Sequence, residues 1–294
     1  MLSWIREPFF KVIHTDVLSR MGLKEAKVFS ENQISNTCVI RADSVKSTKT
    51  DDRRAVKKFL LTEDDSNAMA TSWARFKHEV MFLQALKHPN IVKMTAAFSC
   101  PTHLAIVMDC ARSDLHERLV HLRPERSIEI VAQLVDAVCF LHSRRVVHGD
   151  TTLENVLYFP KEGIVKLCDF SHAQIISVHT DRPMMWLSNE GYQPPEFNHH
   201  QRWDAFKMDS YALGVLCFAV LTMKYPKSGI DYLCELNNHY FEQVHKIFLT
   251  HLLTVCPIQR QTVTQARHVL TKRKKPEVSK QCTMFLHTKH RRLM

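Results

Sequence analysis

The sequence predicts an α+β fold in two lobes: a small antiparallel-sheet N-lobe with one main helix, and a larger, mainly helical C-lobe. Two observations predict this order of elements. Short runs rich in β-branched and aromatic residues fill positions 27–110, and apolar residues at helical spacing prevail from residue 126 onward. With 294 residues, 45% apolar and 24% charged, the chain has the length and composition of a globular protein.

The N-lobe is expected to hold five strands around a single helix. Three antiparallel strands are expected between Lys27 and Leu61, and apolar residues at helical spacing predict a helix from Ser72 to Lys87. The His-Pro-Asn sequence at residues 88–90 ends that helix. The clearest of the first three strands are those at residues 38–42 and 54–60, and two further strands are expected at residues 91–98 and 104–110.

The C-lobe is expected to be built from helices. Residues 126–145 place their apolar side chains on one face, as a core-facing helix does. The longest apolar run, residues 211–223, is too short to span a bilayer and suits a buried helix. Further helices are expected to about Lys272, and no membrane span is predicted.

Charge and cysteine content limit the setting of the chain. The net charge of +10 favours an acidic partner, such as a nucleotide, nucleic acid, acidic protein or membrane surface, although a basic surface without a special partner explains it equally well. The nine cysteines include no Cys-x-x-Cys pair, which favours a reducing compartment over a disulfide framework or a zinc site. No signal peptide is recognised in the first 22 residues.

These elements divide the chain into four parts: an N-terminal extension at 1–25, the N-lobe at 26–110, the C-lobe at 111–272 and a basic tail at 273–294. We expect an intracellular, cytoplasmic protein. The basic tail leaves nuclear import open, with a solvated tail as the favoured interpretation. No direct nucleic-acid module is recognised.

A polar set between His148 and Asp169 carries the chemistry. Asp150, Asn155 five residues later, and Asp169 at the end of a predicted strand supply carboxylate and amide oxygens. Such oxygens suit a metal ion that bridges the phosphates of a nucleotide, and a carboxylate also suits the base that an acceptor hydroxyl needs.

Around this set the sequence resembles the eukaryotic protein kinase domain over residues 27–270. The resemblance rests on several motifs in the right order. They are Ala55-Val56-Lys57 with Glu79, His148-Gly149-Asp150 with Asn155, Asp169-Phe170-Ser171, Pro194-Pro195-Glu196 and residues 209–214. As in that family, Arg260 is placed to pair with Glu196.

The resemblance implies ATP and Mg²⁺ as cofactors and assigns a role to each catalytic residue. Lys57 would bind the α/β-phosphates and be held by an ion pair with Glu79. Asn155 and Asp169 would be the metal ligands. Asp150 would orient the acceptor hydroxyl and take its proton.

The resemblance also assigns the nucleotide pocket and the apolar stack between the lobes. Backbone groups at Met108, Asp109, Cys110 and Ala111 would meet the adenine, and Asp114 would reach the ribose. The ring would lie between Val39, Ala55 and Leu157. Leu83, Met94, Phe170 and His148 would form the apolar stack, anchored by Asp209.

Two departures from the family pattern weaken phosphate binding and catalysis. The glycines of the phosphate loop would fall on Asn32, Ile34 and Thr37, and residues 30–38 contain no Gly, so backbone amides should approach phosphate less closely. Thr152 stands where Ser/Thr protein kinases carry a Lys, and Asn189 stands where its Thr partner belongs.

Two further departures concern regulation. Gly149 replaces the Arg that would pair with a phosphorylated activation loop, so we expect no regulation by loop phosphorylation. Ser171 replaces the Gly after Phe170 and should restrict that hinge to negative φ.

We therefore expect an ATP-binding protein kinase-like chain that transfers phosphoryl groups to protein Ser/Thr hydroxyls with weak or atypical activity. The alternative is a pseudokinase that acts as a scaffold or allosteric regulator. A small-molecule phosphotransferase is a third possibility, opposed by the C-lobe motifs. A protein substrate or regulated partner is expected, and the sequence does not determine the oligomeric state.

Overall fold

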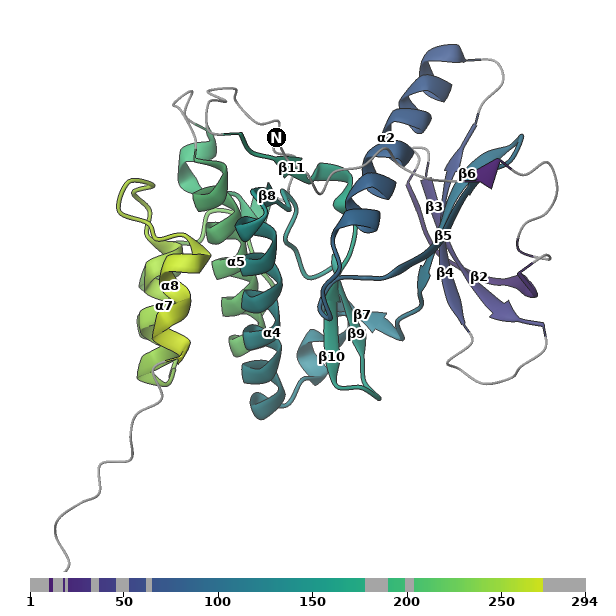
Figure 1. Cartoon of the computed structure of the whole chain (residues 1–294). Coiled ribbons are helices and arrows are strands. Elements are labelled where there is room, and N and C mark those ends of the chain that lie inside the picture. Colours follow the sequence, from purple (N-terminus) through teal and green to yellow (C-terminus); the bar gives the residue numbers. More distant parts are fainter. Residues whose placement is uncertain are drawn as a thin grey trace, which may run out of the picture.

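The computed structural model describes residues 11–12, 18, 21–32, 37–45, 53–61, 65–177, 190–198 and 204–271. These residues form the two lobes that the sequence predicts, a sheet with one long helix and a larger group of helices (Figure 1). The sequence-based expectations for Ile34, Asn189, most of residues 1–25 and all of residues 273–294 lie outside the described residues.

The N-lobe sheet has six strands in the order β1-β5-β6-β4-β3-β2, and all neighbours are antiparallel except β1 and β5. The five predicted strands are confirmed. The sixth, β1, is only two residues long and carries no periodic signal. The bounds are β1 Lys11–Val12, β2 Leu23–Asn32, β3 Thr37–Ser44, β4 Arg54–Leu60, β5 Met94–Ser99 and β6 His103–Asp109.

One long helix, α2 (Ser66–Ala85), packs on this sheet. It begins six residues before the predicted start at Ser72, and this part of the prediction is wrong. The side chain of Asp65 accepts hydrogen bonds from the backbone amides of Asn67 and Ala68, which caps the helix before its apolar pattern begins. The buried face includes Phe76, whose ring meets Phe59 of β4 edge to face at 5.8 Å.

The C-lobe is mainly helical, with two small sheets ordered β10-β9-β7 and β11-β8. Its helices are α3 Leu115–Arg118, α4 Pro124–Ser143, α5 Ala205–Thr222, α6 Tyr232–Asn238, α7 Gln243–Leu253 and α8 Val263–Thr271. Its strands are β7 Ser113–Asp114, β8 Val146–Val147, β9 Val156–Phe159, β10 Ile164–Leu167 and β11 Gln174–Ile175. Short 3₁₀ turns are η2 Leu119–His121, η3 Phe170–His172, η4 Glu190–Tyr192 and η5 Pro195–Asn198.

Helix α5 forms the centre of the C-lobe (Figure 1). In the described part of the chain it is the one helix long and apolar enough to cross a membrane, but 72% of it is buried inside the protein, as in a core helix. A side chain at Gly214 would place its Cβ 2.9 Å from Leu252, so glycine lets α5 and α7 pack closely. The predicted run at 211–223 is therefore confirmed as a buried helix with an earlier start, capped by Asp204.

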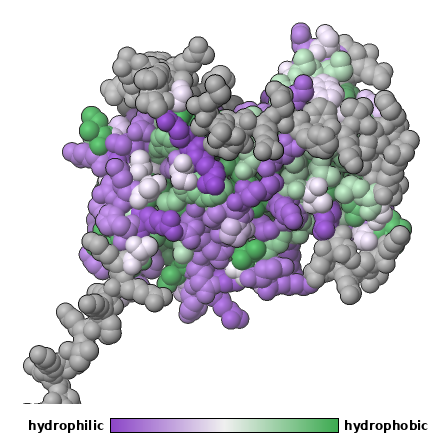
Figure 2. Space-filling model, in the orientation of Figure 1, coloured by the Kyte–Doolittle hydropathy of each residue, from purple (hydrophilic) through white to green (hydrophobic). Residues whose placement is uncertain are grey.

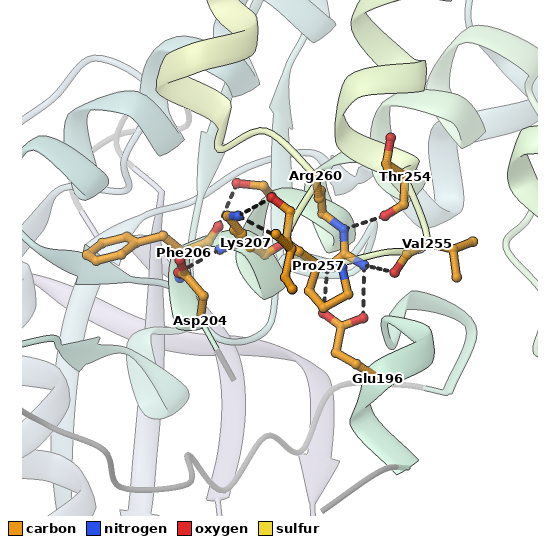
Figure 3. A network of polar contacts seen from close by, with 10 residues as sticks. Glu196, Asp204, Phe206, Lys207, Thr254, Val255, Pro257 and Arg260 are labelled. Atoms are coloured by element: carbon orange, nitrogen blue, oxygen red, sulfur yellow. Dashed lines mark hydrogen bonds and ion pairs between the residues drawn. The ribbon is translucent and has the colours of Figure 1, made fainter. Parts of the chain in front are cut away.

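Hydrophilic residues cover much of the described C-lobe surface in the view of Figure 2, and hydrophobic residues appear there in separated areas. Beneath this surface, Arg260 and Glu196 form the ion pair that the sequence predicts (Figure 3). Arg260 Nη1 donates to Glu196 Oε1 at 2.6 Å, and Nη2 donates to Oε2 at 2.8 Å. The guanidinium also donates to backbone carbonyls of Thr254 and Val255.

Replacing Arg260 with Met should lower the free energy of unfolding by roughly 3–5 kcal/mol, because the change leaves the carboxylate of Glu196 buried without its partner. Arg267→Ala is the matched control, since the Arg267–Asp136 pair is about half exposed and should contribute no more than about 1 kcal/mol. Urea denaturation measures both. Equal losses in the two variants would contradict the prediction.

Candidate active site

The site is centred on Lys57, a buried cation between two carboxylates from different elements. Lys57 Nζ on β4 donates to Glu79 Oε2 on α2 at 2.7 Å and to Asp169 Oδ1 at 2.9 Å. Lys57 and Glu79 are buried, and the Asp169 side chain is 35% exposed toward the adjoining cavity. The three residues therefore join the N-lobe sheet, its helix and the end of β10.

The charges of this triad depend on one another. Burial alone would lower the pKa of Lys57, but the charges of Asp169 and Glu79 outweigh it and raise that pKa, so the ammonium stays protonated. Burial raises the pKa of Glu79 to about 7, although the charge of Lys57 opposes the rise. One cation thus contacts two carboxylates, and Glu79 is the carboxylate that is protonated first as the pH falls.

Asp169 is held in an unusual backbone conformation. Its φ is 58°, and its side chain accepts a hydrogen bond from the backbone amide of Ser171 at 3.2 Å. Burial opposes ionisation, but Lys57 and the hydrogen bonds from Lys57 and Ser171 hold the pKa of Asp169 below its ordinary value. Ser171 is not among the described residues with positive φ, as the sequence predicts.

Asp150 and Asn155 are joined directly. Asn155 Nδ2 donates to Asp150 Oδ2 at 2.6 Å and to the Asp150 carbonyl at 3.0 Å. Burial, followed by the charge of Asp169, raises the pKa of Asp150 to about 7, against the lowering effect of Asn155. A carboxyl group with a pKa near neutrality suits a general base.

Asp209 on α5 supports the loop that carries Asp150. Its carboxylate accepts from the backbone amides of His148 and Gly149, both at 3.2 Å, and from Thr151 Oγ1 at 3.3 Å. His142 Nε2 lies 2.8 Å from the same carboxylate. The anchoring role expected for Asp209 is therefore visible as hydrogen bonds to three residues of the loop, His148, Gly149 and Thr151, together with the close approach of His142 on α4.

The apolar stack expected between the lobes is also present. The ring of Phe170 meets His148 edge to face at 5.0 Å and lies over Phe82 of α2 at 6.3 Å. Leu83 belongs to the same core, and Met94 packs against it. Phe82 is an aromatic partner of Phe170 that was not predicted from the sequence. It lies one helical turn after His78 and Glu79, on the same face of α2.

Gly149, which the sequence analysis treated only as the replacement of an Arg, also has a structural role. Its φ is +79°, and a Cβ there would lie 2.5 Å from the backbone oxygen of His172. Glycine thus allows the loop at 148–150 to press against η3, the turn that follows Asp169. On the other side of this turn, His78 Nε2 lies 2.9 Å from the Ala173 carbonyl.

A cavity of about 320 Å³ opens beside the triad. Predicted site residues line it, among them Val39, Ala55, Lys57, Glu79, Met108, Asp109, Asp114, Leu157 and Asp169. Asn155 and Ala111 line it as well. Asp114 also accepts a hydrogen bond from the backbone amide of Glu117 at 2.8 Å, so it caps α3 in addition to facing the cavity.

Two predicted residues lie outside this cavity. Cys110 does not line it and instead lines a second, adjoining cavity. Asp150 is joined to the lining through Asn155. The lining also contains residues that were not predicted from the sequence: Lys27, Phe29, Ser30, Arg112, Ser113, Glu117, Glu154 and Cys168. Cys168 directly precedes Asp169, which was a usable signal, whereas the N-terminal position of Phe29 gave none.

The donor set fits a cation that arrives with phosphates. In the described residues no group of three or more His, Cys, Asp or Glu side chains forms a ready-made metal site. Asn155 donates through its amide nitrogen to Asp150, which makes its oxygen the atom that can coordinate a cation, and Asp169 offers a partly exposed carboxylate. Mg²⁺ commonly binds one or two carboxylates and completes its shell with phosphate and water oxygens.

Comparison with known proteins agrees with this geometry. A family model described as "Protein kinase domain" matches residues 39–291. The chain is 32% identical over 163 residues to the rice serine/threonine-protein kinase SAPK1, covering 53% of this chain and 46% of that protein. It is 30% identical over 220 residues to the Arabidopsis thaliana serine/threonine-protein kinase TIO, covering 69% of this chain and 16% of that protein.

A wheat relative, "Abscisic acid-inducible protein kinase", is 31% identical over 163 residues, covering 53% of this chain and 48% of its own length. The chain thus spans less than half the length of these first curated relatives. The family match begins at Val39, so residues 27–38, where the phosphate-loop glycines were sought, lie before it.

Gly149→Ala should destabilise the protein by at least about 2 kcal/mol more than Gly229→Ala. Both glycines have positive φ, which costs an alanine roughly 1–2 kcal/mol, but only Gly149 has an atom within 4 Å of the added Cβ. Chemical denaturation of the two variants separates the contact from the backbone cost. Similar losses of stability in the two variants would show that the contact with His172 does not add to the destabilisation.

The raised pKa of Glu79 should make its contribution to stability depend on pH. The folded protein holds the Glu79 proton up to about pH 7, whereas the unfolded chain releases it near its ordinary value of 4.5. The stabilising effect is therefore complete below pH 4.5 and is lost as the pH rises through 7. The stability of wild type relative to Glu79→Gln should fall by roughly 1–3 kcal/mol between pH 5 and pH 8, measured by urea denaturation. A constant difference would contradict this.

Proposed function

The chain belongs to the eukaryotic protein kinase superfamily, and from that premise we propose that it binds Mg-ATP and transfers a phosphoryl group to a Ser or Thr hydroxyl of a protein, with weak or atypical activity. The observation that carries this proposal is the contact of Lys57 with both Glu79 and Asp169 at the wall of a cavity. A buried ammonium between two carboxylates is costly to maintain, and phosphate binding gives it a use.

Each residue of the site has a definite task in this proposal. Lys57 binds the α/β-phosphates and is oriented by Glu79. Asn155 and Asp169 hold Mg²⁺, which neutralises charge on the phosphates when it is bound. Asp150, with its pKa raised to about 7 by burial, accepts the proton of the acceptor hydroxyl, while Asn155 fixes the orientation of its carboxylate.

The adenine side of the cavity supports the same proposal. Ala55 and Val39 come from adjacent strands of the N-lobe sheet, and Leu157 comes from β9 of the C-lobe. Their apolar side chains suit the two faces of a purine ring. Backbone groups between Met108 and Ala111 suit its edge.

Weak activity is proposed because three auxiliary features are absent from the sequence. Residues 30–38 contain no glycine to bring backbone amides close to phosphate. Thr152 is uncharged and only 4% exposed. This position therefore supplies no cation to stabilise the phosphoryl group during transfer. Asn189 replaces the Thr expected beside it.

The absence of these three features also favours a second candidate function, a pseudokinase that acts as a scaffold or allosteric regulator. In that case Lys57, Asn155 and Asp169 serve nucleotide binding alone, and the lobes present a surface to a protein partner. The two candidates share the binding site and differ only in turnover.

A protein substrate or partner and an intracellular location complete the proposal. The names of the relatives support a protein as the substrate. The eight described cysteines are free thiols, which supports a reducing compartment. Nuclear import through the basic tail at 273–294 remains part of the proposal for location.

Nucleotide binding is tested by thermal and chemical stability with and without Mg-ATP. At a nucleotide concentration one hundred times its Kd, wild type should gain about 2.7 kcal/mol of stability. Lys57→Met should gain much less, because the cation that meets the phosphates is gone. No gain in wild type would overturn nucleotide binding.

Transfer is tested in the same preparation with radiolabelled ATP and a generic protein substrate. Wild type should show turnover that falls at least about a hundredfold in Asp150→Ala, the range expected for loss of a general base. Arg267→Ala, far from the cavity lining, serves as the control and should keep wild-type turnover. Binding without turnover above the Asp150→Ala background would select the pseudokinase.

A further inference from the structure

A second cavity, of about 620 Å³, adjoins the nucleotide cavity and shares Asp109, Ala111 and Arg112 with it. Both lobes build it. Strands β2, β3 and β4 contribute from the N-lobe, and the β9–β10 hairpin contributes from the C-lobe (Figure 1). We call it the basic groove and define it by its cationic lining residues, Lys27, Arg41, Arg53, Arg54, Arg112, Lys161 and Lys166.

The charge of the basic groove is strongly one-sided. Among the described residues, its lining contains those seven cations and two carboxylates, Asp109 and Glu162. Asp43, which pairs with Arg41 and Arg53, adds a third carboxylate nearby. Cations still outnumber carboxylates by four within one concave surface. Like charges gathered in a cleft repel one another and attract a polyanion.

The groove is held in shape by one ion pair between the lobes and two within the N-lobe. Lys166 Nζ donates to Asp109 Oδ2 at 2.7 Å, which ties the hairpin to the segment that joins the lobes. Arg41 Nε lies 2.9 Å from Asp43 Oδ1 and Arg53 Nε lies 3.5 Å from the same atom. Burial raises the pKa of the Cys110 thiol, while the nearby Arg41, Arg53 and Arg54 act to lower it, so the arginines converge on this residue.

Two aromatic rings in the lining distinguish between possible anions. Lys27 Nζ lies 6.0 Å from the centre of the Phe29 ring, and Lys166 Nζ lies 4.8 Å from that of Phe159. A nucleic-acid strand stacks successive bases on a row of open ring faces, whereas here a lysine ammonium lies over one face of each of the two rings. Phe29 remains 44% exposed, which leaves apolar surface for an aliphatic or aromatic side chain.

We propose that the basic groove binds an extended acidic segment of a protein partner, in which carboxylate or phosphoryl groups alternate with an apolar side chain. The cations come from strands, a connecting segment and a hairpin of two lobes, so a linear ligand can meet them in succession. Arginine forks suit both carboxylate and phosphoryl oxygens. A cavity of this volume accommodates a short peptide segment.

This inference rests on the proposed function only in taking a protein as the partner. It requires neither ATP nor phosphoryl transfer. A chain that is inactive in the transfer assay can still bind the acidic segment, and a chain that fails to bind it can still be active. The two proposals therefore fail separately.

The test is fluorescence anisotropy of a labelled ten-residue peptide with six Asp or Glu and one central Phe, titrated with the full chain in the absence of nucleotide. We expect saturable binding that weakens as salt is raised. The same peptide with Asn and Gln in place of the acidic residues should not bind. A phosphoserine version distinguishes the two sources of charge, and tighter binding of either acidic form supports the proposal.

The double variant Arg53→Glu/Lys161→Glu places one reversal in each lobe and spares the nucleotide cavity. It should weaken peptide binding at least about tenfold. Lys24→Glu/Lys224→Glu carries the same change of net charge on exposed residues outside both cavities and should stay within about twofold of wild type. If the first pair fails to fold, Lys161→Glu alone, in the exposed hairpin turn, replaces it.

Three results would overturn the proposal. One is the absence of saturable binding to either acidic peptide. Another is equal weakening in the two charge-matched double variants, which would reduce the effect to net charge. The third is tighter binding of a single-stranded RNA of equal charge with the same loss in Arg53→Glu/Lys161→Glu, which would assign the groove to nucleic acid.

Discussion

The arrangement of this protein depends on the position of Lys57 between Glu79 and Asp169. A buried ammonium is stable only when its charge is matched, and here the two matching carboxylates come from α2 and from the end of β10. The ion pair therefore fixes α2 against the sheet and the N-lobe against the C-lobe. Removing either carboxylate changes the electrostatics of the other, because a single cation serves both.

A second buried carboxylate, that of Asp209 on α5, fixes the loop at residues 148–151 in a similar way. Asp209 collects the amides of His148 and Gly149 and the hydroxyl of Thr151, which sets the loop that presents Asp150. Phe170 then links this loop to α2 through the rings of His148 and Phe82. The loop that carries Asp150 and the helix that holds Lys57 through Glu79 thus both pack on the ring of Phe170.

Much of this was predictable from the sequence, and the reasons for the failures are physical. Periodicity located the five main N-lobe strands and α4, while the start of α2 depends on the Asp65 cap, which an apolar pattern does not record. The triad followed from ordered motifs. Gly149 was read only as a missing arginine, because its positive φ and its closeness to His172 arise from tertiary packing. The basic groove escaped notice because five separate segments supply its cations.

The two cavities have opposite charge, and this difference bears on how nucleotide and partner can share one molecule. Carboxylates line much of the nucleotide cavity, where Asp114, Glu117, Glu154 and Asp169 suit a ligand that brings cations with it. An acidic segment would be repelled there and drawn to the adjoining basic groove. Since Lys27, Phe29 and Arg112 line both cavities, a ligand in one contacts residues that shape the other. If a segment bound in the groove changes nucleotide affinity through these shared residues, nucleotide must change affinity for the segment by the same factor.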